Sequence, residues 1–401
     1  MEELKTYRLA DICNSIQTGP FGSQLHKSDY VEFGTPIVMP KDITNGKIND
    51  NNISRISKND VARLFKHKLV PGNIIYPRRG DISKCALITS KEDGWVCGTG
   101  CIKVDINQQI ANSTYVMYVL CQSETVNWIE SNAVGTTMLN LNTSILSDLP
   151  IKLPSLNTQK KLANIVSSFD KKIALNRRIN DNLEQQAQAL FKSWFVDFEP
   201  FKNGKFVESE IGMIPEGWKV GNLLDVAELS DSKRKPLSAM ERSNMNKVYP
   251  YYGATSIMDY VDDYLFDGIY LLMGEDGSVM TENGFPYLQY VSGKFWVNNH
   301  AHIMQGKNAF TTEMLHCLLF RKNISEFVTG AVQAKISQNN MKRIKLAIAP
   351  ANVLDSFSKL LDSIYSQIRQ KKKESDVLCK KRDLLLPKLM SGKIKINDLN
   401  S

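Results

Sequence analysis

The chain has 401 residues and a formal net charge of +8, and 42% of its residues are hydrophobic. This length suggests two or three domains, and the hydrophobic content is enough for ordinary cores. The seven cysteines are an odd number without framework spacing, which indicates a reducing cytosol rather than a disulfide scaffold. No apolar run approaches the roughly 18 residues of a membrane span, and residues 1–9 lack the apolar stretch of a signal peptide. We therefore expect a cytoplasmic protein without contact to a membrane.

Residues 1–154 are interpreted as a first globular domain of mixed strands, loops and some helix. The glycine-proline loop 19–23 would let backbone N–H groups approach a ligand closely, and an ordinary turn is the alternative. A turn signal precedes a strand over residues 72–76, and a basic loop, residues 77–81, follows this strand.

A long amphipathic helix is expected over residues 155–197, followed by a connector, residues 198–215. Apolar residues recur on a 4-3-4-3 spacing, which is a heptad seam of more than four heptads. At 1.5 Å per residue such a helix is roughly 50–55 Å long. The seam residues expected to pair with another helix are Phe169, Ile173, Leu183 and Leu190.

The second half of the chain repeats this plan. Residues 216–350 are interpreted as a second globular domain, residues 351–392 as a second long helix, and residues 393–401 as a C-terminal tail. Neither long helix has a sequence neighbour that could cover its seam, so the simplest partner of each helix is the other. The pairing residues expected in the second helix are Ile364, Ile368, Leu378 and Leu385.

The two halves also resemble each other in sequence, at an offset of about 195 residues. Residues 72–76 line up with 268–272, and residues 95–97 line up with 295–297. Self-similarity at a fixed offset indicates tandem copies of one structural unit. The predicted fold class is α+β, with two mixed α/β domains in tandem pseudo-repeat, bridged by two long helices that form an antiparallel coiled coil.

Two similar heads on a two-fold arrangement suit the dyad of duplex DNA and two separated half-sites, which should differ because the heads differ. A two-headed protein–protein adaptor would share this geometry. Arginine can bond guanine bidentately and lysine more often holds phosphate, although basic surface loops are common and tyrosine clusters are more often packing. The candidate DNA-binding residues are Gln17, Thr18, Gly19, Phe21, Ser23, Arg78, Arg79 and Lys84 in the first domain, and Lys233, Arg234, Lys235, Tyr251, Tyr252, Asn298, Asn299 and Lys335 in the second.

Motifs for catalysis are weak or missing. A methyltransferase needs a glycine-rich cofactor turn and an Asn/Asp-Pro-Pro-aromatic site, and an ATPase needs a phosphate-binding loop, and the sequence has none of these. The pairs Cys97/Cys101 and His300/His302 lack a second pair at ligand spacing, which favours core strands over zinc sites. The acidic loop 274–277 could serve a metal-dependent nuclease, but a turn after a strand is favoured. We expect no catalytic residue, metal or cofactor in this chain.

Four segments carry a resemblance to a known family. They are residues 189–198 (AlaLeuPheLysSerTrpPheValAspPhe), residues 214–218 (IleProGluGlyTrp), the loop 19–23 (GlyProPheGlySer) and residues 382–389 (ArgAspLeuLeuLeuProLysLeu). On these segments, and on the repeat, the chain resembles the specificity subunit of type I restriction-modification systems.

The resemblance implies two target-recognition domains that read a bipartite, asymmetric site in double-stranded DNA, one half-site per domain. It also implies a complex with two methyltransferase subunits, which methylate adenine, and with restriction subunits. S-adenosylmethionine, ATP and Mg2+ would belong to those partners. The adaptor and the metal-dependent nuclease remain the alternative functions.

Overall fold

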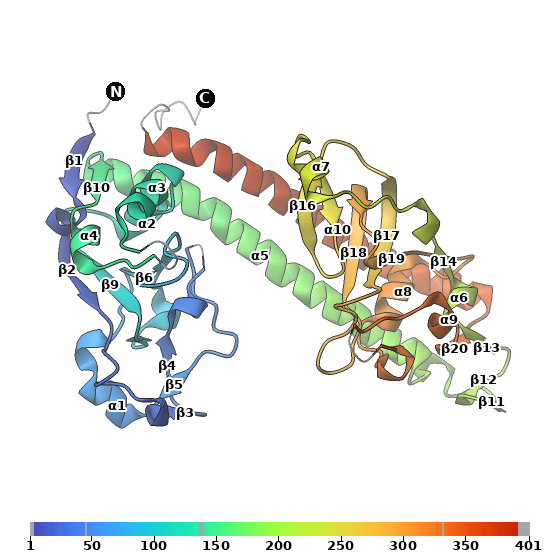
Figure 1. Cartoon of the computed structure of the whole chain (residues 1–401). Coiled ribbons are helices and arrows are strands. Elements are labelled where there is room, and N and C mark those ends of the chain that lie inside the picture. Colours follow the sequence, from blue (N-terminus) through green and yellow to red (C-terminus); the bar gives the residue numbers. More distant parts are fainter. Residues whose placement is uncertain (1–3, 45, 136–138, 331–332, 392–401) are drawn as a thin grey trace. The chain divides into compact units, whose positions relative to one another are not determined.

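The computed structural model describes residues 4–44, 46–135, 139–330 and 333–391. The chain divides into two compact units, and Figure 1 shows its elements. Unit 1 consists of residues 1–173 and 376–401, and unit 2 consists of residues 174–375. Each unit therefore combines one globular part with segments of both long helices, α5 (Leu156–Phe195) and α10 (Ala351–Met390).

The globular part of unit 1 contains two four-stranded sheets, with the strand orders β2-β9-β6-β7 and β3-β5-β4-β8. A core of buried residues joins the first sheet to α2, and it includes Ile74, Val104 and Tyr115. The strands are β1 (Lys5–Arg8), β2 (Cys13–Thr18), β3 (Tyr30–Val31), β4 (Thr35–Val38), β5 (Arg55–Ile56), β6 (Asn73–Pro77), β7 (Ala86–Leu87), β8 (Val96–Cys97), β9 (Cys101–Ile106) and β10 (Pro150–Leu153). The helices are α1 (Lys58–Arg63), α2 (Ser113–Leu120), α3 (Ser123–Asn132) and α4 (Thr143–Ser147).

Unit 2 is built on a six-stranded sheet with the order β14-β19-β17-β18-β15-β16. Its strands are β14 (Ala227–Leu229), β15 (Tyr249–Tyr252), β16 (Ile257–Val261), β17 (Phe266–Gly274), β18 (Leu288–Val297) and β19 (Ala301–Gly306). Smaller pairs are formed by β11 (Phe206–Ser209) with β12 (Gly212–Pro215), and by β13 (Lys219–Asn222) with β20 (Lys345–Ile348). The short helices are α6 (Leu223–Val226), α7 (Ala239–Ser243), α8 (Thr312–Leu319) and α9 (Gln338–Met341).

The internal repeat is visible in strand pairing. In unit 1, β6 pairs antiparallel with β9 and β4 pairs parallel with β8, and in unit 2, β17 pairs antiparallel with β19 and β15 pairs parallel with β18. The alignment of residues 95–97 with 295–297 holds, because Val38 faces Cys97 in one unit and Tyr252 faces Val297 in the other.

The alignment of residues 72–76 with 268–272 is wrong by one residue. Pro77 faces Cys101 and Gly274 faces Ala301, so Pro77 and Gly274 occupy the same position at the end of β6 and β17. Side chains alternate between the two faces of a strand, so a shift of one residue would exchange its buried and opposite faces. The partner strand therefore determines the register, which the sequence comparison alone did not.

The two long helices run antiparallel within unit 2. Near the end of α5, the ring of Phe195 lies 4.8 Å from the ring of Phe357, near the start of α10. Further back along α5, the Asn180 side-chain amide donates to the Ile368 carbonyl at 3.3 Å, and that of Asn176 donates to Glu374 at 3.1 Å. Residue numbers fall along one helix as they rise along the other, which confirms the predicted antiparallel pairing.

In unit 1 the first part of α5 and the last part of α10 share one core, which includes Leu162 and Leu389. Arg382 donates to Asp170 at 2.7 Å, and the Tyr118 hydroxyl donates to the other oxygen of that carboxylate at 2.5 Å. This charged contact ties the helix pair to α2 of the globular part.

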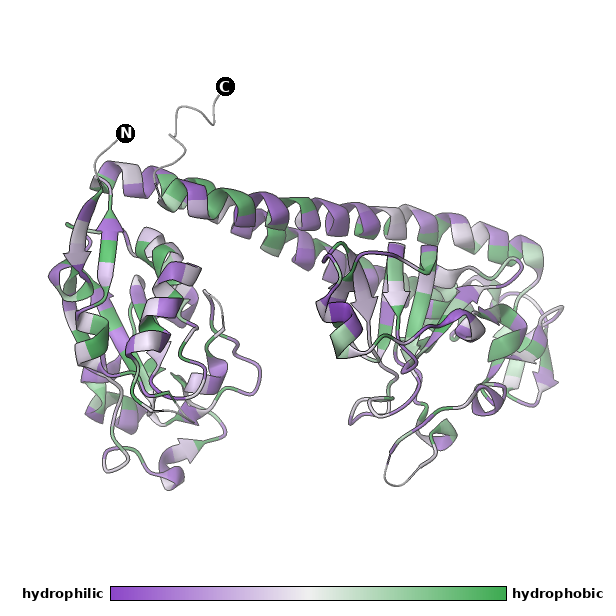
Figure 2. Ribbon diagram, turned by 45° about the horizontal axis from the view of Figure 1, so that its top comes forward, coloured by the Kyte–Doolittle hydropathy of each residue, from purple (hydrophilic) through white to green (hydrophobic). Residues whose placement is uncertain are grey.

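The predicted seam residues differ in burial. Ile173, Leu183, Ile364 and Ile368 are buried, whereas Phe169, Leu190, Leu378 and Leu385 are half-buried. Figure 2 shows hydrophobic and hydrophilic residues interspersed along both helices, as an amphipathic helix requires. Among the described helices, none combines the length and apolar character needed to cross a membrane. The predicted tail, residues 393–401, lies outside the described residues.

Candidate nucleic-acid interface

Three loops of unit 1 meet at one end of its main sheet. Strands β2 and β6 end where β9, which lies between them, begins. The Gly19 amide donates to the Cys101 carbonyl at 2.8 Å, and the Arg78 amide donates to the Gly100 carbonyl at 2.6 Å. We call the loops 18–23, 78–81 and 98–100 the loop edge of unit 1. The sheet thus brings together two segments that the sequence nominated separately.

The glycine-proline loop depends on close backbone packing. A Cβ on Gly19 would overlap the carbonyl oxygen of Gly98, so only glycine permits this approach. Phe21 is 57% exposed and Ser23 is exposed, whereas the side-chain amide of Gln17 donates to the Lys66 carbonyl at 2.6 Å. Phe21 and Ser23 are therefore available to a ligand, whereas the Gln17 amide is held by the protein.

Basic side chains surround a small hollow beside this edge. The hollow has a volume of about 270 Å³ and is lined by residues that include Lys41, Arg79 and Lys84. Lys84 pairs with Asp81 at 2.6 Å, whereas Lys41 and Arg79 are exposed. Exposed cations at a concave surface suit a phosphate group.

Unit 2 has the same loop edge, made by residues 230–235, 275–277 and 298–300. The Glu275 amide donates to the His300 carbonyl at 2.9 Å, as the Arg78 amide donates to Gly100. The Ile336 amide donates to the Glu275 carbonyl at 2.9 Å, as the Leu141 amide donates to the Arg78 carbonyl. Glu275 of unit 2 therefore occupies the position of Arg78, and the Lys335 position corresponds to Asn140.

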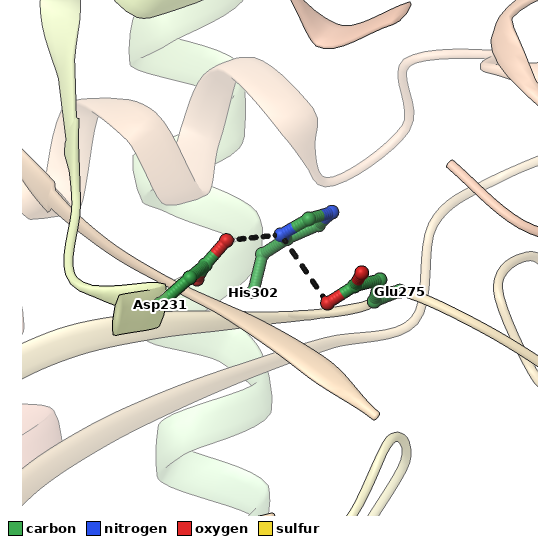
Figure 3. A group of neighbouring side chains, drawn as sticks. All are labelled: Asp231, Glu275 and His302. Atoms are coloured by element: carbon green, nitrogen blue, oxygen red, sulfur yellow. Dashed lines mark hydrogen bonds and ion pairs between the residues drawn. The ribbon is translucent and has the colours of Figure 1, made fainter. Parts of the chain in front are cut away.

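The side chains at the two edges differ, because unit 2 has an internal charge network (Figure 3). The ring Nδ1 of His302, in β19, lies 2.6 Å from Asp231 and 3.7 Å from Glu275. Arg234 donates to Glu275 at 2.5 Å and to the Ala301 carbonyl at 2.8 Å. The buried carboxylates are thus balanced by cations of the same unit.

Ionisation favours a charged pair at the centre of this network. Burial lowers the pKa of His302, but the hydrogen bond and charge of Asp231 outweigh burial, and the net effect raises this pKa. Burial raises the pKa of Asp231, and hydrogen bonds led by His302 outweigh it, so that pKa is lowered. The raised pKa of His302 and the lowered pKa of Asp231 both favour the charged forms, an imidazolium next to a carboxylate.

Asp231, Glu275 and His302 lie close enough together to be considered as metal ligands. However, Arg234 already neutralises Glu275, and the Asp231 carboxylate also accepts from Gln338 at 2.8 Å and from the Ile303 amide at 2.9 Å. A bound cation would have to share this space with a guanidinium. The chemistry of the group fits an internal ion network, and the acidic loop 274–277 contributes to that network rather than to a nuclease site.

Three of the predicted DNA-binding residues are buried in unit 2, and a fourth, Arg234, is half-buried and bonded within the unit. Tyr251 and Tyr252 are 1% and 7% exposed, because β15 occupies the position that the buried Ile37 and Val38 of β4 hold in unit 1. The Tyr251 hydroxyl accepts from the Leu237 amide at 3.0 Å. The prediction that these tyrosines contact DNA is therefore wrong, and they pack the core.

Asn298 and Arg234 need the same correction. Asn298 is 4% exposed, and its side-chain oxygen accepts from the His300 amide at 2.8 Å. The Arg234 side chain is 16% exposed and is held by Glu275. Each therefore stabilises the loop edge from inside. The predicted residues that remain exposed in unit 2 are Lys233, Lys235, Asn299 and Lys335.

Sequence reasoning missed Thr99 in the loop edge of unit 1, and it also missed two residues beside this edge, Asn140, which pairs with Arg79, and Lys41, which lines the hollow. A signal existed for Asn140, because the offset of about 195 residues between the repeats maps it onto Lys335, which was nominated. No sequence signal marked Lys41 and Thr99 as DNA-binding. Lys41 follows β4, which pairs with β8, whereas Thr99 lies between β8 and β9 of the other sheet.

Comparisons with known proteins agree with this architecture. The family model described as "Type I restriction modification DNA specificity domain" matches residues 1–185 and 215–378. The chain is 26% identical to the MjaIX specificity subunit of Methanocaldococcus jannaschii, over 91% of this chain and 88% of that protein. It is 21% identical to the HindI specificity subunit of Haemophilus influenzae, over 98% of this chain and 100% of that protein.

Solved structures show the same fold. The crystal structure of a type I restriction-modification S subunit from M. genitalium matches with a TM-score of 0.59 at 17% identity, over 97% of this chain and 96% of that one. The family match covers both globular parts and most of both long helices. The chain therefore belongs to the type I restriction-modification DNA specificity family, and it is a specificity subunit that carries two copies of the family's domain.

Proposed function

We propose that each globular domain binds one half of a bipartite, asymmetric target in double-stranded DNA through its loop edge. The observation that carries this proposal is the repetition of one loop arrangement with different side chains. Arg78 and Asn140 in unit 1 stand where Glu275 and Lys335 stand in unit 2. The two units share the backbone arrangement of their loops but differ in the side chains at equivalent positions. Such a difference suits two half-sites of different sequence.

Exposed cations at both edges suit the DNA backbone. Lys41 and Arg79 in unit 1, and Lys233, Lys235 and Lys335 in unit 2, are all exposed. Each phosphate contact releases counterions, so binding should weaken steeply as salt is raised. Backbone contacts of this kind position a protein on the duplex, whereas contacts to base edges provide sequence preference.

The chemistry belongs to partner proteins in this proposal. The chain would act in the cytoplasm and assemble with two methyltransferase subunits, which methylate adenine within the target, and with restriction subunits. S-adenosylmethionine, ATP and Mg2+ would be bound by those partners. Family membership supports this assignment, and the acidic loop of unit 2, being neutralised by Arg234, gives no support to a nuclease in this chain.

Methylation mapping tests the proposal. A host without related enzymes would carry this chain together with its methyltransferase partner, and adenine methylation would be mapped across the genome. We expect one bipartite motif with two different halves, and no such motif when this chain is omitted. A single continuous motif, or a motif that does not depend on this chain, would refute the proposal.

A matched pair of variants tests the loop edge of unit 2 in the same assay. Lys233→Ala combined with Lys235→Ala should weaken methylation at all sites while the motif stays the same, because exposed lysines hold phosphate and do not read bases. Lys205→Ala, an exposed lysine in the connector, should leave both unchanged. If the double variant and Lys205→Ala have equal effects on methylation, Lys233 and Lys235 do not contact DNA.

A further inference from the structure

Three half-buried polar side chains at the loop edge of unit 1 each have one buried atom without a partner. The Nε of Arg78, the hydroxyl of Thr99 and the side-chain oxygen of Asn140 are each buried and have no hydrogen-bond partner among the described residues. Proteins pair the great majority of their buried polar groups, so an unpaired group at a surface edge needs an explanation. A cluster of three indicates a ligand that supplies the missing partners.

The backbone around these side chains is firmly held. Arg78 donates to Gly100, next to Thr99, and accepts from Leu141, next to Asn140, at 2.6 and 2.8 Å. Asn140 also exchanges two backbone hydrogen bonds with Val134, at 2.8 and 3.1 Å. The three unpaired groups therefore start from a fixed frame, which reduces the entropy lost on binding a ligand.

The unit 2 positions equivalent to Arg78 and Asn140 have partners. Glu275, at the position of Arg78, is bonded by Arg234, and Lys335, at the position of Asn140, pairs with Glu275 at 3.4 Å. The unpaired groups are thus a property of unit 1 and not a consequence of the fold. The loop edge of unit 1 keeps polar groups free to bind a ligand, whereas in unit 2 Glu275 is paired with Arg234 and Lys335.

We propose that Arg78, Thr99 and Asn140 read base edges of the half-site bound by unit 1. A guanidinium has five donors and no acceptor, which matches the two acceptors of guanine in the major groove. A side-chain amide has both a donor and an acceptor, which matches adenine, and a hydroxyl serves either base. The basic hollow with Lys41, Arg79 and Lys84 lies beside these residues and would contact phosphate.

This inference rests on the proposed function, and its test uses the full chain assembled with its methyltransferase partner. Binding would be selected from a duplex library in which every position of both half-sites is randomised. Arg78→Ala and Asn140→Ala should each lose discrimination by about 5- to 150-fold at one or two positions of one half-site. The other half-site and its spacing should stay unchanged.

Further variants separate base reading from other roles. Arg78→Lys keeps the charge but loses the planar fork, and Thr99→Val keeps the shape but loses the hydroxyl, so both should lose discrimination with unchanged melting temperature. Lys41→Ala, at an exposed lysine of the hollow, should weaken binding to all sequences equally and leave the consensus unchanged.

The outcomes are distinct. If the wild-type complex selects a bipartite motif and these variants select the same one, the inference fails while the proposed function stands. Uniform weakening by Arg78→Ala and Asn140→Ala, or a loss of stability with an unchanged motif, also overturns the inference. A wild-type complex without sequence preference would instead refute the proposed function.

Discussion

Replacing Arg234 by alanine should destabilise unit 2 by about 3 kcal/mol, whereas its neighbours should tolerate the same change. Breaking a buried ion pair by removing one partner costs about 3–5 kcal/mol, because it leaves a buried charge uncompensated. The Arg234 side chain is 16% exposed and that of Glu275 is 12% exposed. Glu275 keeps a second cation, Lys335 at 3.4 Å, which is half exposed, so we expect the low end of this range.

Calorimetry of the full chain measures this loss. For a domain of this size each 1 kcal/mol lowers the melting temperature by roughly 2–4 °C, so the transition of unit 2 should fall by roughly 6–12 °C. Lys233→Ala and Lys235→Ala are matched controls, because these exposed neighbours should change stability by no more than about 0.5 kcal/mol. Adding Glu275→Gln to Arg234→Ala should recover part of the loss, since it removes the unpaired charge.

Two results would refute this reasoning. If Arg234→Ala melts like Lys233→Ala, the guanidinium does not hold the network together. If Arg234→Ala keeps its stability but changes the bases preferred at one half-site, the residue reads DNA, as the sequence alone suggested. In either case the internal charge network would not explain why unit 2 buries Asp231 and Glu275.

The remaining predictions concern the helix pair and pH. Phe357→Ala, at a ring that packs on Phe195 and is fully buried, should cost about 3–5 kcal/mol in chemical unfolding, whereas Leu360→Ala, 44% exposed on the same helix, should cost far less; equal losses would contradict the pairing. The ion pair of Asp231 with His302 should stabilise unit 2 fully between about pH 4 and pH 6.5. This contribution is lost as the pH falls through the lowered pKa of Asp231, and it is also lost as the pH rises through the raised pKa of His302. His302→Gln should therefore lower the melting temperature within this window and remove the decline above about pH 6.5.

Much of the architecture could be predicted because its signals are local and periodic. A heptad seam predicts which face of a helix is buried. Because neither seam has another neighbour in sequence, the simplest prediction is that the two long helices pair with each other. Polar residues take part in the pairing too, since Asn176 and Asn180 bond across the helix pair of unit 2. The alignment of two segments, residues 72–76 and 95–97, located their equivalents to within one residue.

The candidate site was predicted only in part, because composition does not distinguish an exposed basic residue from a buried one. Lys233, Arg234 and Lys235 look alike in sequence, yet only Arg234 turns inward to meet Glu275. Tyr251 and Tyr252 suggested stacking on bases, but the parallel pairing of β15 with β18 buries them. Burial depends on contacts between strands far apart in the chain.

The sequence by itself determined the two long helices, the tandem repeat and the family, because periodicity, internal similarity and short motifs are properties of neighbouring residues. Only the tertiary structure decided which side chains stand at each loop edge and whether they are free. Antiparallel pairing around β9 brings Gly19, Arg78 and Thr99 together, and the equivalent pairing around β19 gathers a charge network instead. The reason is physical: strand register places distant residues side by side, and the partners found there decide whether a polar group is satisfied internally or left for a ligand.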